Sequence, residues 1–228
     1  MKKLIFIAVL TAGSFAGNLF AQNFGVQVGG NLASTKLEYK LPGGTISQDT
    51  KSKLGFLIGA VAEFPFTSSI SFRPELNFIQ KGYKFDLTES GSTYTQDATL
   101  NYIELPLNFI YNAPAGKGTF FVGAGPNFSF GLSGKIKTTE TGEPNENSDI
   151  KFDGKENATS TDNNYHLKGF DLGGNLLAGY KLANGLSFNI GYTVGFLDIS
   201  PDKEATHKNS GGLTFKLGYM FGGTGSKD

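Results

Sequence analysis

The chain has 228 residues, no cysteine, 32 glycines and 21 phenylalanines, and its formal net charge at pH 7 is zero. The lack of cysteine excludes thiol catalysis, thiolate metal sites and disulfides. The balanced charge does not support a basic surface for nucleic acid, whereas abundant glycine and aromatic residues suit a narrow, strongly curved β-barrel.

The N-terminal residues predict a secretory signal peptide over residues 1–21. Two lysines precede an apolar run, Leu4–Leu10, and small residues follow it. We predict cleavage after Ala21, with Ala16 as a second candidate. A membrane anchor is the alternative, but the run is shorter than the ~20 residues that a spanning helix needs. Residues 22–228 are expected to form one outer-membrane β-barrel domain.

Apolar and polar residues alternate with period two in eight segments of the remaining chain. Successive side chains of a strand point to opposite faces, so each segment predicts a strand with one apolar and one polar face. In the first segment, Phe24 and Val26 share one face and Gln27 lies on the other. The eight strands are expected at residues 23–37, 53–66, 70–85, 100–112, 119–136, 167–182, 186–200 and 211–221.

The connections between these strands alternate between short and long. Short turns are expected at 67–69, 113–118 and 183–185, and long polar loops at 38–52, 86–99, 137–166 and 201–209. This pattern predicts an all-β fold, an eight-stranded antiparallel up-and-down transmembrane β-barrel with OmpA-like architecture. The short turns and both termini would face the periplasm, and the long loops the cell exterior. A soluble β-sandwich with its apolar faces packed together is the alternative.

Three prolines fall inside the expected strands. Pro74, Pro106 and Pro126 each lack the N–H that a β-ladder uses, so we expect a local bulge at each one.

The inward face carries charged residues of both signs. If Ser68 centres the first turn, Glu63 lies opposite Arg73, and if the next loop centres near residues 92–93, Lys81 lies opposite Glu104. Opposite charges across strands contribute about 0.2–1 kcal/mol each. Because eight strands leave little open bore, we predict a salt-bridged plug, with the lining of an ion path as the alternative. The predicted network comprises Glu63, Arg73, Glu75, Lys81, Glu104, Asp171 and Lys216.

The only histidines, His166 and His207, are expected at the exterior rim as solvated loop residues. A weak metal site or a Ser/His/acid site is the alternative, since some barrels of this size modify lipid A. We predict neither an enzyme nor a metal site.

The loop at 137–166 is rich in carboxylates. We expect a hydrated, mobile surface loop, with calcium binding as the alternative. Its acidic residues are Glu140, Glu143, Glu146, Asp149, Asp153, Glu156 and Asp162.

Several motifs resemble PorT-family outer-membrane barrels of the Bacteroidetes. The run Phe72-Arg73-Pro74-Glu75-Leu76, followed by Gln80-Lys81-Gly82, resembles the third strand of that family, and Tyr102-Ile103-Glu104-Leu105-Pro106-Leu107 resembles its fourth. Residues 121–126, 170–173 and 217–221 fit the fifth, sixth and closing strands. The resemblance covers essentially the whole mature chain. It implies an outer-membrane barrel without a cofactor, in a family named for a member linked to protein secretion.

The expected function is therefore that of an integral barrel of the cell outer membrane with a structural or interaction role and a filled lumen. Its expected partners are outer-membrane lipid, a protein at the extracellular loops, and the insertion machinery, which would read the C-terminal strand. Residues 222–228 after Phe221 depart from the usual aromatic end of such barrels. The alternatives are an accessory component of a secretion apparatus, a narrow small-solute pore and a lipid-modifying enzyme.

Overall fold

A computed structural model describes residues 23–89, 91–157 and 160–221. The predicted signal peptide and the tail after Phe221 lie outside the described residues. None of the described segments is a helix of the length and apolarity that a membrane span requires. The strands are β1 (Asn23–Leu41), β2 (Gly44–Asp49), β3 (Lys51–Pro65), β4 (Ile70–Glu89), β5 (Ser92–Ala115), β6 (Gly118–Glu140), β7 (Glu146–Lys151), β8 (Tyr165–His166), β9 (Phe170–Leu182), β10 (Leu186–Gly195) and β11 (Ala205–Met220).

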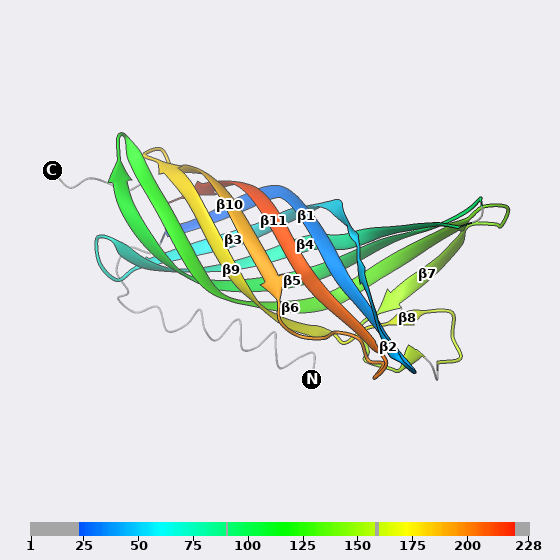
Figure 1. Ribbon diagram of the computed structural model, residues 1–228. Coiled ribbons are helices and arrows are strands. Elements are labelled where there is room, and N and C mark those ends of the chain that lie inside the picture. Colours follow the sequence, from blue (N-terminus) through cyan, green and yellow to red (C-terminus); the bar gives the residue numbers. More distant parts are fainter. Residues whose placement is uncertain (1–22, 90, 158–159, 222–228) are drawn as a thin grey trace.

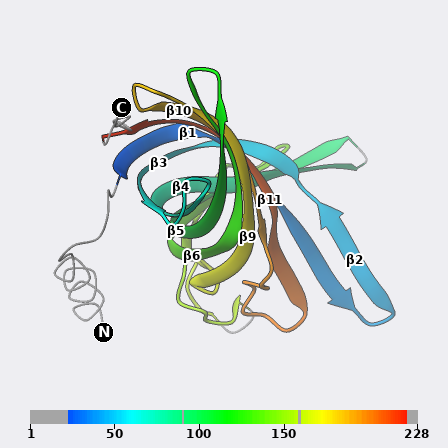
Figure 2. The same ribbon diagram turned by 90° about the vertical axis from the view of Figure 1, so that its left-hand side faces the viewer.

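Eight of these strands pair in a closed ring (Figures 1 and 2). The order is β1, β3, β4, β5, β6, β9, β10, β11 and back to β1, and every pair in the ring is antiparallel. Closure gives each strand of the ring a hydrogen-bonded neighbour on both sides and leaves no open edge. The predicted eight-stranded antiparallel barrel is confirmed.

Side-chain exposure alternates along the ring strands in the predicted sense. In β1, Phe24 and Val26 are about half exposed, whereas Gln27 and Asn31 are buried. The outer face of the ring is therefore apolar and the inner face largely polar. This is the reverse of a soluble β-sandwich, in which apolar faces are packed together.

At one end of the barrel, β1, β4, β5, β6 and β11 are longer than the sequence predicts, whereas β9 begins at Phe170 and β10 ends at Gly195, short of the expected limits at 167 and 200. β4 continues to Glu89 and β5 already begins at Ser92. The two strands pair over this length, so the expected loop 86–99 is part of a β-hairpin. β1 ends at Leu41, and the chain then turns back as β2, which pairs with β1. The expected loop 137–166 contains β7 and β8. Polar segments beyond the apolar belt still satisfy their backbone groups by pairing with a neighbour, and polarity alone does not reveal this.

The expected bulges at the three prolines are wrong. Pairing keeps the same register on both sides of Pro74, Pro106 and Pro126. A missing N–H removes one ladder bond, but it does not by itself require an additional residue in the strand. The register shifts instead between Ser34 and Thr35 and between Asn101 and Tyr102 in the described strands, and also within 52–57 of β3.

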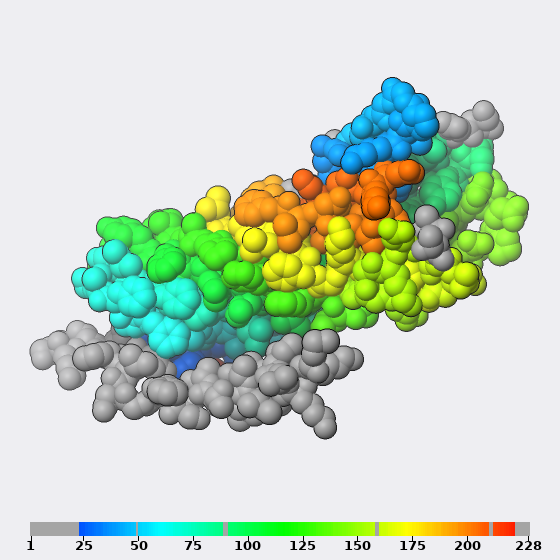
Figure 3. All heavy atoms as spheres, turned by 90° about the horizontal axis from the view of Figure 1, so that it is seen from below, coloured from blue at the N-terminus to red at the C-terminus, as the bar shows by residue number. Residues whose placement is uncertain are grey.

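The two ends of the barrel differ. Short turns join β3 to β4, β5 to β6 and β9 to β10 at the end where β1 begins and β11 finishes. At the opposite end the strands extend past the ring, and the β1–β2 hairpin, blue in Figure 3, stands out from the molecule. The long extensions and the short turns thus form two chemically distinct rims.

Candidate functional site: the lumen and its cap

All seven charged residues predicted to face inward are buried, none more than 8% exposed. They come from β3, β4, β5, β9 and β11 and form three groups along the lumen. A charge removed from water is costly unless it is paired and hydrogen-bonded, so the partners of each group decide whether the lumen is stable.

The central group surrounds Glu75. Its Oε2 atom accepts hydrogen bonds from Lys216 Nζ at 2.6 Å and from Gln27 Nε2 at 2.7 Å, and Arg73 Nε lies 3.9 Å from Oε1. The Arg73 guanidinium also lies over the ring of Phe121, 4.7 Å from its centroid. Two cations and one carboxylate therefore fill the middle of the bore.

A second group lies near the short-turn end. Glu63 accepts from Lys181 Nζ at 3.1 Å and from Ser71 Oγ at 3.0 Å. β3 and β4 do pair about Ser68, since Phe64 lies opposite Phe72. The nearest cation to Glu63 is nevertheless Lys181, which the sequence reasoning missed. Lys181 shares the inward parity of Asp171 and could have been found from it, but it stands at the end of its strand.

The third group lies towards the long-strand end. Lys81 forms an ion pair with Glu104, and Ser129 Oγ donates to Glu104 at 3.0 Å. Asp171 accepts from Asn209 Nδ2 at 2.8 Å.

The predicted register behind the Lys81–Glu104 pair is wrong. Lys81 lies opposite Leu100, and the residue opposite Glu104 is Asn77. Glu89 pairs with Ser92, so the hairpin is centred before the predicted 92–93, and the lysine side chain reaches Glu104 along the lumen.

An apolar cluster closes the lumen beyond this third group, and the sequence analysis did not predict it. Most members are inward-facing residues of the ring strands, while Ile150, Leu167 and Ile199 come from the connections that fold into the mouth. The ring of Phe152 packs against Tyr102, with 5.2 Å between centroids. The cluster comprises Leu37, Leu57, Ile79, Tyr83, Ala98, Leu100, Tyr102, Ile136, Ile150, Leu167 and Ile199, and we call it the cap.

His166 is buried and hydrogen-bonded, so the expectation of a solvated loop histidine is wrong. Nδ1 lies 2.7 Å from Asp153 Oδ1, and Nε2 lies 3.0 Å from Asp162 Oδ1. The two carboxylates raise the pKa of His166, and the histidine lowers the pKa of Asp153 and of Asp162. The imidazolium thus ties together Asp153 and Asp162 in the connection that contributes Ile150 and Leu167 to the cap.

The contacts of His166 resemble a Ser-His-Asp triad in connectivity, because Ser160 Oγ lies 3.1 Å from Nε2. The same hydroxyl also donates to Asp162 Oδ1 at 3.0 Å. That carboxylate oxygen is also hydrogen-bonded to Nε2 of His166. A general base needs a free lone pair on the nitrogen that faces the nucleophile. An imidazolium held between two carboxylates lacks it, so this cluster is a structural bridge.

His207 in β11 is also buried, 2% exposed, with its ring packed edge-on against Tyr83. Its backbone N–H donates to Asp198 Oδ1 at 2.9 Å. The two histidines therefore do not form a common site at the rim. Within residues 23–89, 91–157 and 160–221, no group of three or more His, Asp or Glu side chains has the arrangement of a metal site.

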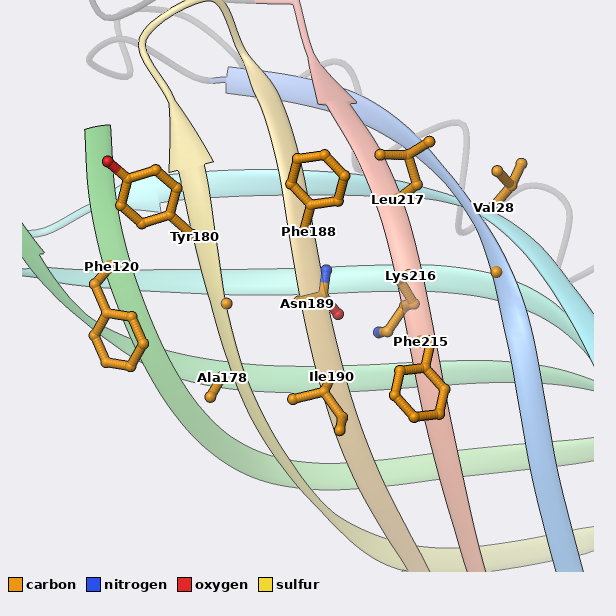
Figure 4. Close-up of a pocket in the computed structure, with 12 residues that line it drawn as sticks. Val28, Phe120, Ala178, Tyr180, Phe188, Asn189, Ile190, Phe215, Lys216 and Leu217 are labelled. Carbon is orange, nitrogen blue, oxygen red and sulfur yellow. The ribbon is translucent and has the colours of Figure 1, made fainter. Parts of the chain in front are cut away.

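The outer face of the barrel carries a shallow apolar hollow of about 700 Å³ across β1, β6, β9, β10 and β11 (Figure 4). The small side chain of Ala178 lies between larger ones, with Phe120 and Tyr180 on one side and Ile190 on the other. Tyr180 turns its hydroxyl to Ala115 O at 2.6 Å, so no polar group is left to face outward there. The hollow suits hydrocarbon contact and shows no catalytic chemistry.

Comparison with known proteins gives one family match. The model of the family described as outer membrane protein beta-barrel domain matches residues 20–201. No curated protein sequence matches the chain.

Solved structures with a similar arrangement include Ail of Yersinia pestis (13% identity, TM-score 0.40, 89% of this chain and 100% of that chain). Neisserial surface protein A is similar at 16% identity and a TM-score of 0.41, over 89% and 99% of the two chains. The outer membrane protease OmpT from Escherichia coli is similar at 12% identity and a TM-score of 0.26, over 90% and 98%.

Proposed function

Because the chain belongs to the family of outer membrane protein beta-barrel domains, we propose that it acts in the outer membrane as a sealed anchor for its extracellular hairpins. The barrel is an integral outer-membrane protein, and its apolar outer face contacts lipid. In hydrocarbon every backbone polar group needs an internal partner, and the closed ring supplies it.

The observation that carries this proposal is the way the lumen is filled. Buried ion pairs occupy the bore at three levels, and the cap then closes it at the extracellular mouth. A solute would have to displace both the charge pairs and the cap. The proposed role of the seven-residue network is therefore to fill and hold the barrel, not to select ions.

The proposed interaction surface lies on the hairpins outside the apolar belt. Tyr39 and Ile46 lie opposite each other on β1 and β2, and each is about half exposed. Leu87 is 44% exposed at the end of the β4–β5 hairpin. Exposed apolar side chains on polar extensions are a common mark of protein contact sites, which supports a protein partner at these hairpins.

We also propose a narrower family, a signal peptide and an insertion signal from the sequence. The ordered motifs support a PorT-like barrel of a Bacteroidetes bacterium, and the basic and apolar N-terminus supports a signal peptide at residues 1–21. We further propose that the insertion machinery reads the aromatic C-terminal strand. We assign no enzymatic activity, since Asp162 occupies the His166 nitrogen that faces the Ser160 hydroxyl.

Planar-bilayer recording of the purified barrel tests the sealed-anchor proposal. We expect no steady single-channel current from the wild type. Arg73→Leu leaves Glu75 with one cation fewer, so it should reduce the free energy of unfolding by about 3–5 kcal/mol. The barrel should therefore unfold at a lower temperature in detergent, and it should still pass no current. Large, steady currents from the wild type would contradict the proposal. Lys51→Leu, which removes an exposed partner of Asp86, is the control and should change little.

A further inference from the structure

We propose that a pocket on the outer wall of the barrel, formed by β5, β6 and β7, binds the phosphorylated sugar headgroup of an outer-leaflet glycolipid. The pocket has a volume of about 450 Å³. The inference rests on insertion in the outer membrane and not on the sealed lumen. Its lining comprises Thr99, Asn101, Leu132, Ser133, Gly134, Lys135, Asp149, Ile150, Lys151 and Phe152.

The pocket lies where the apolar belt ends. Below it, Phe130 lies opposite Ile103 and packs against Phe170, with 5.4 Å between ring centroids. Immediately above, the outward positions become polar, and Asn101 lies opposite Ser133. Because this is the long-strand rim, the change marks the level of the outer-leaflet headgroups.

The polar side of the pocket offers both hydrogen-bond groups and positive charge. Asn101 Nδ2 donates to Ser133 Oγ at 3.1 Å, so the amide and the hydroxyl are held side by side. Lys135 and Lys151 are exposed at the pocket. The one carboxylate there is Asp149, 3.6 Å from Lys151 Nζ. The pocket therefore carries one positive charge more than it has negative charges.

The apolar side of the pocket comes from a β-bulge. The register shifts between Asn101 and Tyr102, so that Leu132 has no cross-strand partner on β5. Leu132 is 54% exposed and separates the polar row from Phe130. A β-bulge changes the direction of a side chain. Here it places the Leu132 side chain beside the position at which an acyl chain would begin, next to the headgroup.

These features together select the ligand class. Two lysines attract a phosphate near the membrane surface, the amide and hydroxyl match sugar hydroxyls, and Leu132 matches an alkyl chain. Inorganic phosphate would not use Leu132, and an anionic phospholipid without sugars would not use the Asn101–Ser133 pair. The occupant that uses all three is a phosphorylated acyl glycolipid.

Native mass spectrometry of the folded, detergent-purified barrel tests the proposal. The probes are bisphosphorylated lipid A, lipid A without its phosphates, phosphatidylglycerol and inorganic phosphate. We expect bisphosphorylated lipid A to bind tightest, and Lys135→Gln with Lys151→Gln to weaken it about tenfold or more. The matched control, Lys40→Gln with Lys208→Gln on β1 and β11, should bind as the wild type does.

Four outcomes would overturn the proposal. They are unchanged binding by the pocket variant, an equal loss in the control variant, equal binding of phosphatidylglycerol, and displacement of lipid A by inorganic phosphate at the same concentration. Ser133→Val, which keeps the charge and removes the hydroxyl beside Asn101, should weaken lipid A but leave phosphatidylglycerol unchanged. None of these results bears on bilayer conductance, so the sealed-anchor proposal is tested separately.

Discussion

Individual residues in this barrel are held by specific side-chain partners, some of them within one connection. His166 is the clearest case, because its ring nitrogens meet Asp153 and Asp162 across a segment of 10 residues, 153–162. Asn157 extends the bridge by donating to Asp202 at 2.8 Å, which links the β7–β8 region to the connection before β11. The stability of the cap is therefore coupled to the charge on one histidine.

We predict that the His166 bridge weakens as pH rises. The two carboxylates raise the pKa of His166 in the folded protein. The stability that the bridge contributes is therefore fully present below the ordinary histidine pKa of about 6.5, and it is lost as pH rises through the raised pKa of the folded protein. Hydrogen–deuterium exchange of peptides from residues 151–167, corrected for the intrinsic pH dependence of exchange, should show greater opening at about pH 9 than at about pH 6.

His166→Gln supplies the control for this pH dependence. Glutamine keeps hydrogen-bonding capacity but does not titrate, so the corrected exchange of 151–167 should become independent of pH. Peptides from the β9–β10 turn report on the opposite end of the barrel and should not respond in either protein. An identical pH slope in the wild type and in the variant would show that another group controls the opening.

At the level of elements, the connection between β6 and β9 contains β7 and β8 and contributes Ile150 and Leu167 to the cap. Gly131 in β6 makes this possible, because a Cβ atom there would lie 2.2 Å from the ring of Phe152. Phe152 in turn packs on Tyr102 at the top of the lumen. A single missing side chain on the wall therefore lets the cap dock.

We predict that Gly131→Val displaces Phe152 and loosens the cap. Overpacking of this kind costs about 1–3 kcal/mol, and the ring cannot remain in place against a new Cβ atom. Limited chymotrypsin digestion of the folded barrel should then cleave after Phe152 faster than in the wild type.

Gly30→Val is the matched control on an open face. A Cβ atom at Gly30 would meet only Leu54, at 4.0 Å. Its digestion pattern should match that of the wild type. Equal protection of Phe152 in both variants would show that the cap does not depend on the space above Gly131.

For the whole molecule, the difference between the two rims predicts which of them faces the cell exterior. The short turns and both ends of the described barrel lie on one rim, and the extended hairpins lie on the other. Family membership places the barrel in the outer membrane, and the long-strand rim is expected outside the cell.

Cysteine labelling tests this orientation, since the chain has no cysteine of its own. We predict that Glu143→Cys, beyond the end of β6, reacts with a membrane-impermeant maleimide on intact cells. Ser68→Cys, in the turn between β3 and β4, should react only after the outer membrane is permeabilised. The opposite pattern would invert the proposed orientation and remove the headgroup pocket from the outer leaflet.

The sequence by itself determined the number, order and facing of the ring strands. Period-two alternation is a local property, so Phe24, Val26 and Gln27 already show which side of β1 faces outward. Alternating connection lengths added the antiparallel order. The same parity selected inward charges such as Glu75 and Lys216, which the structure brings within 2.6 Å.

Only the tertiary structure decided how the strands end and what fills the mouth. The Lys181 partner of Glu63 and the burial of both histidines depend on how the folded strands and connections pack together. A polar segment has the same composition whether it is hydrated or paired, because backbone hydrogen bonds do not require apolar side chains. The cap therefore depends on the tertiary structure, which brings Ile150, Leu167 and Ile199 together over one lumen.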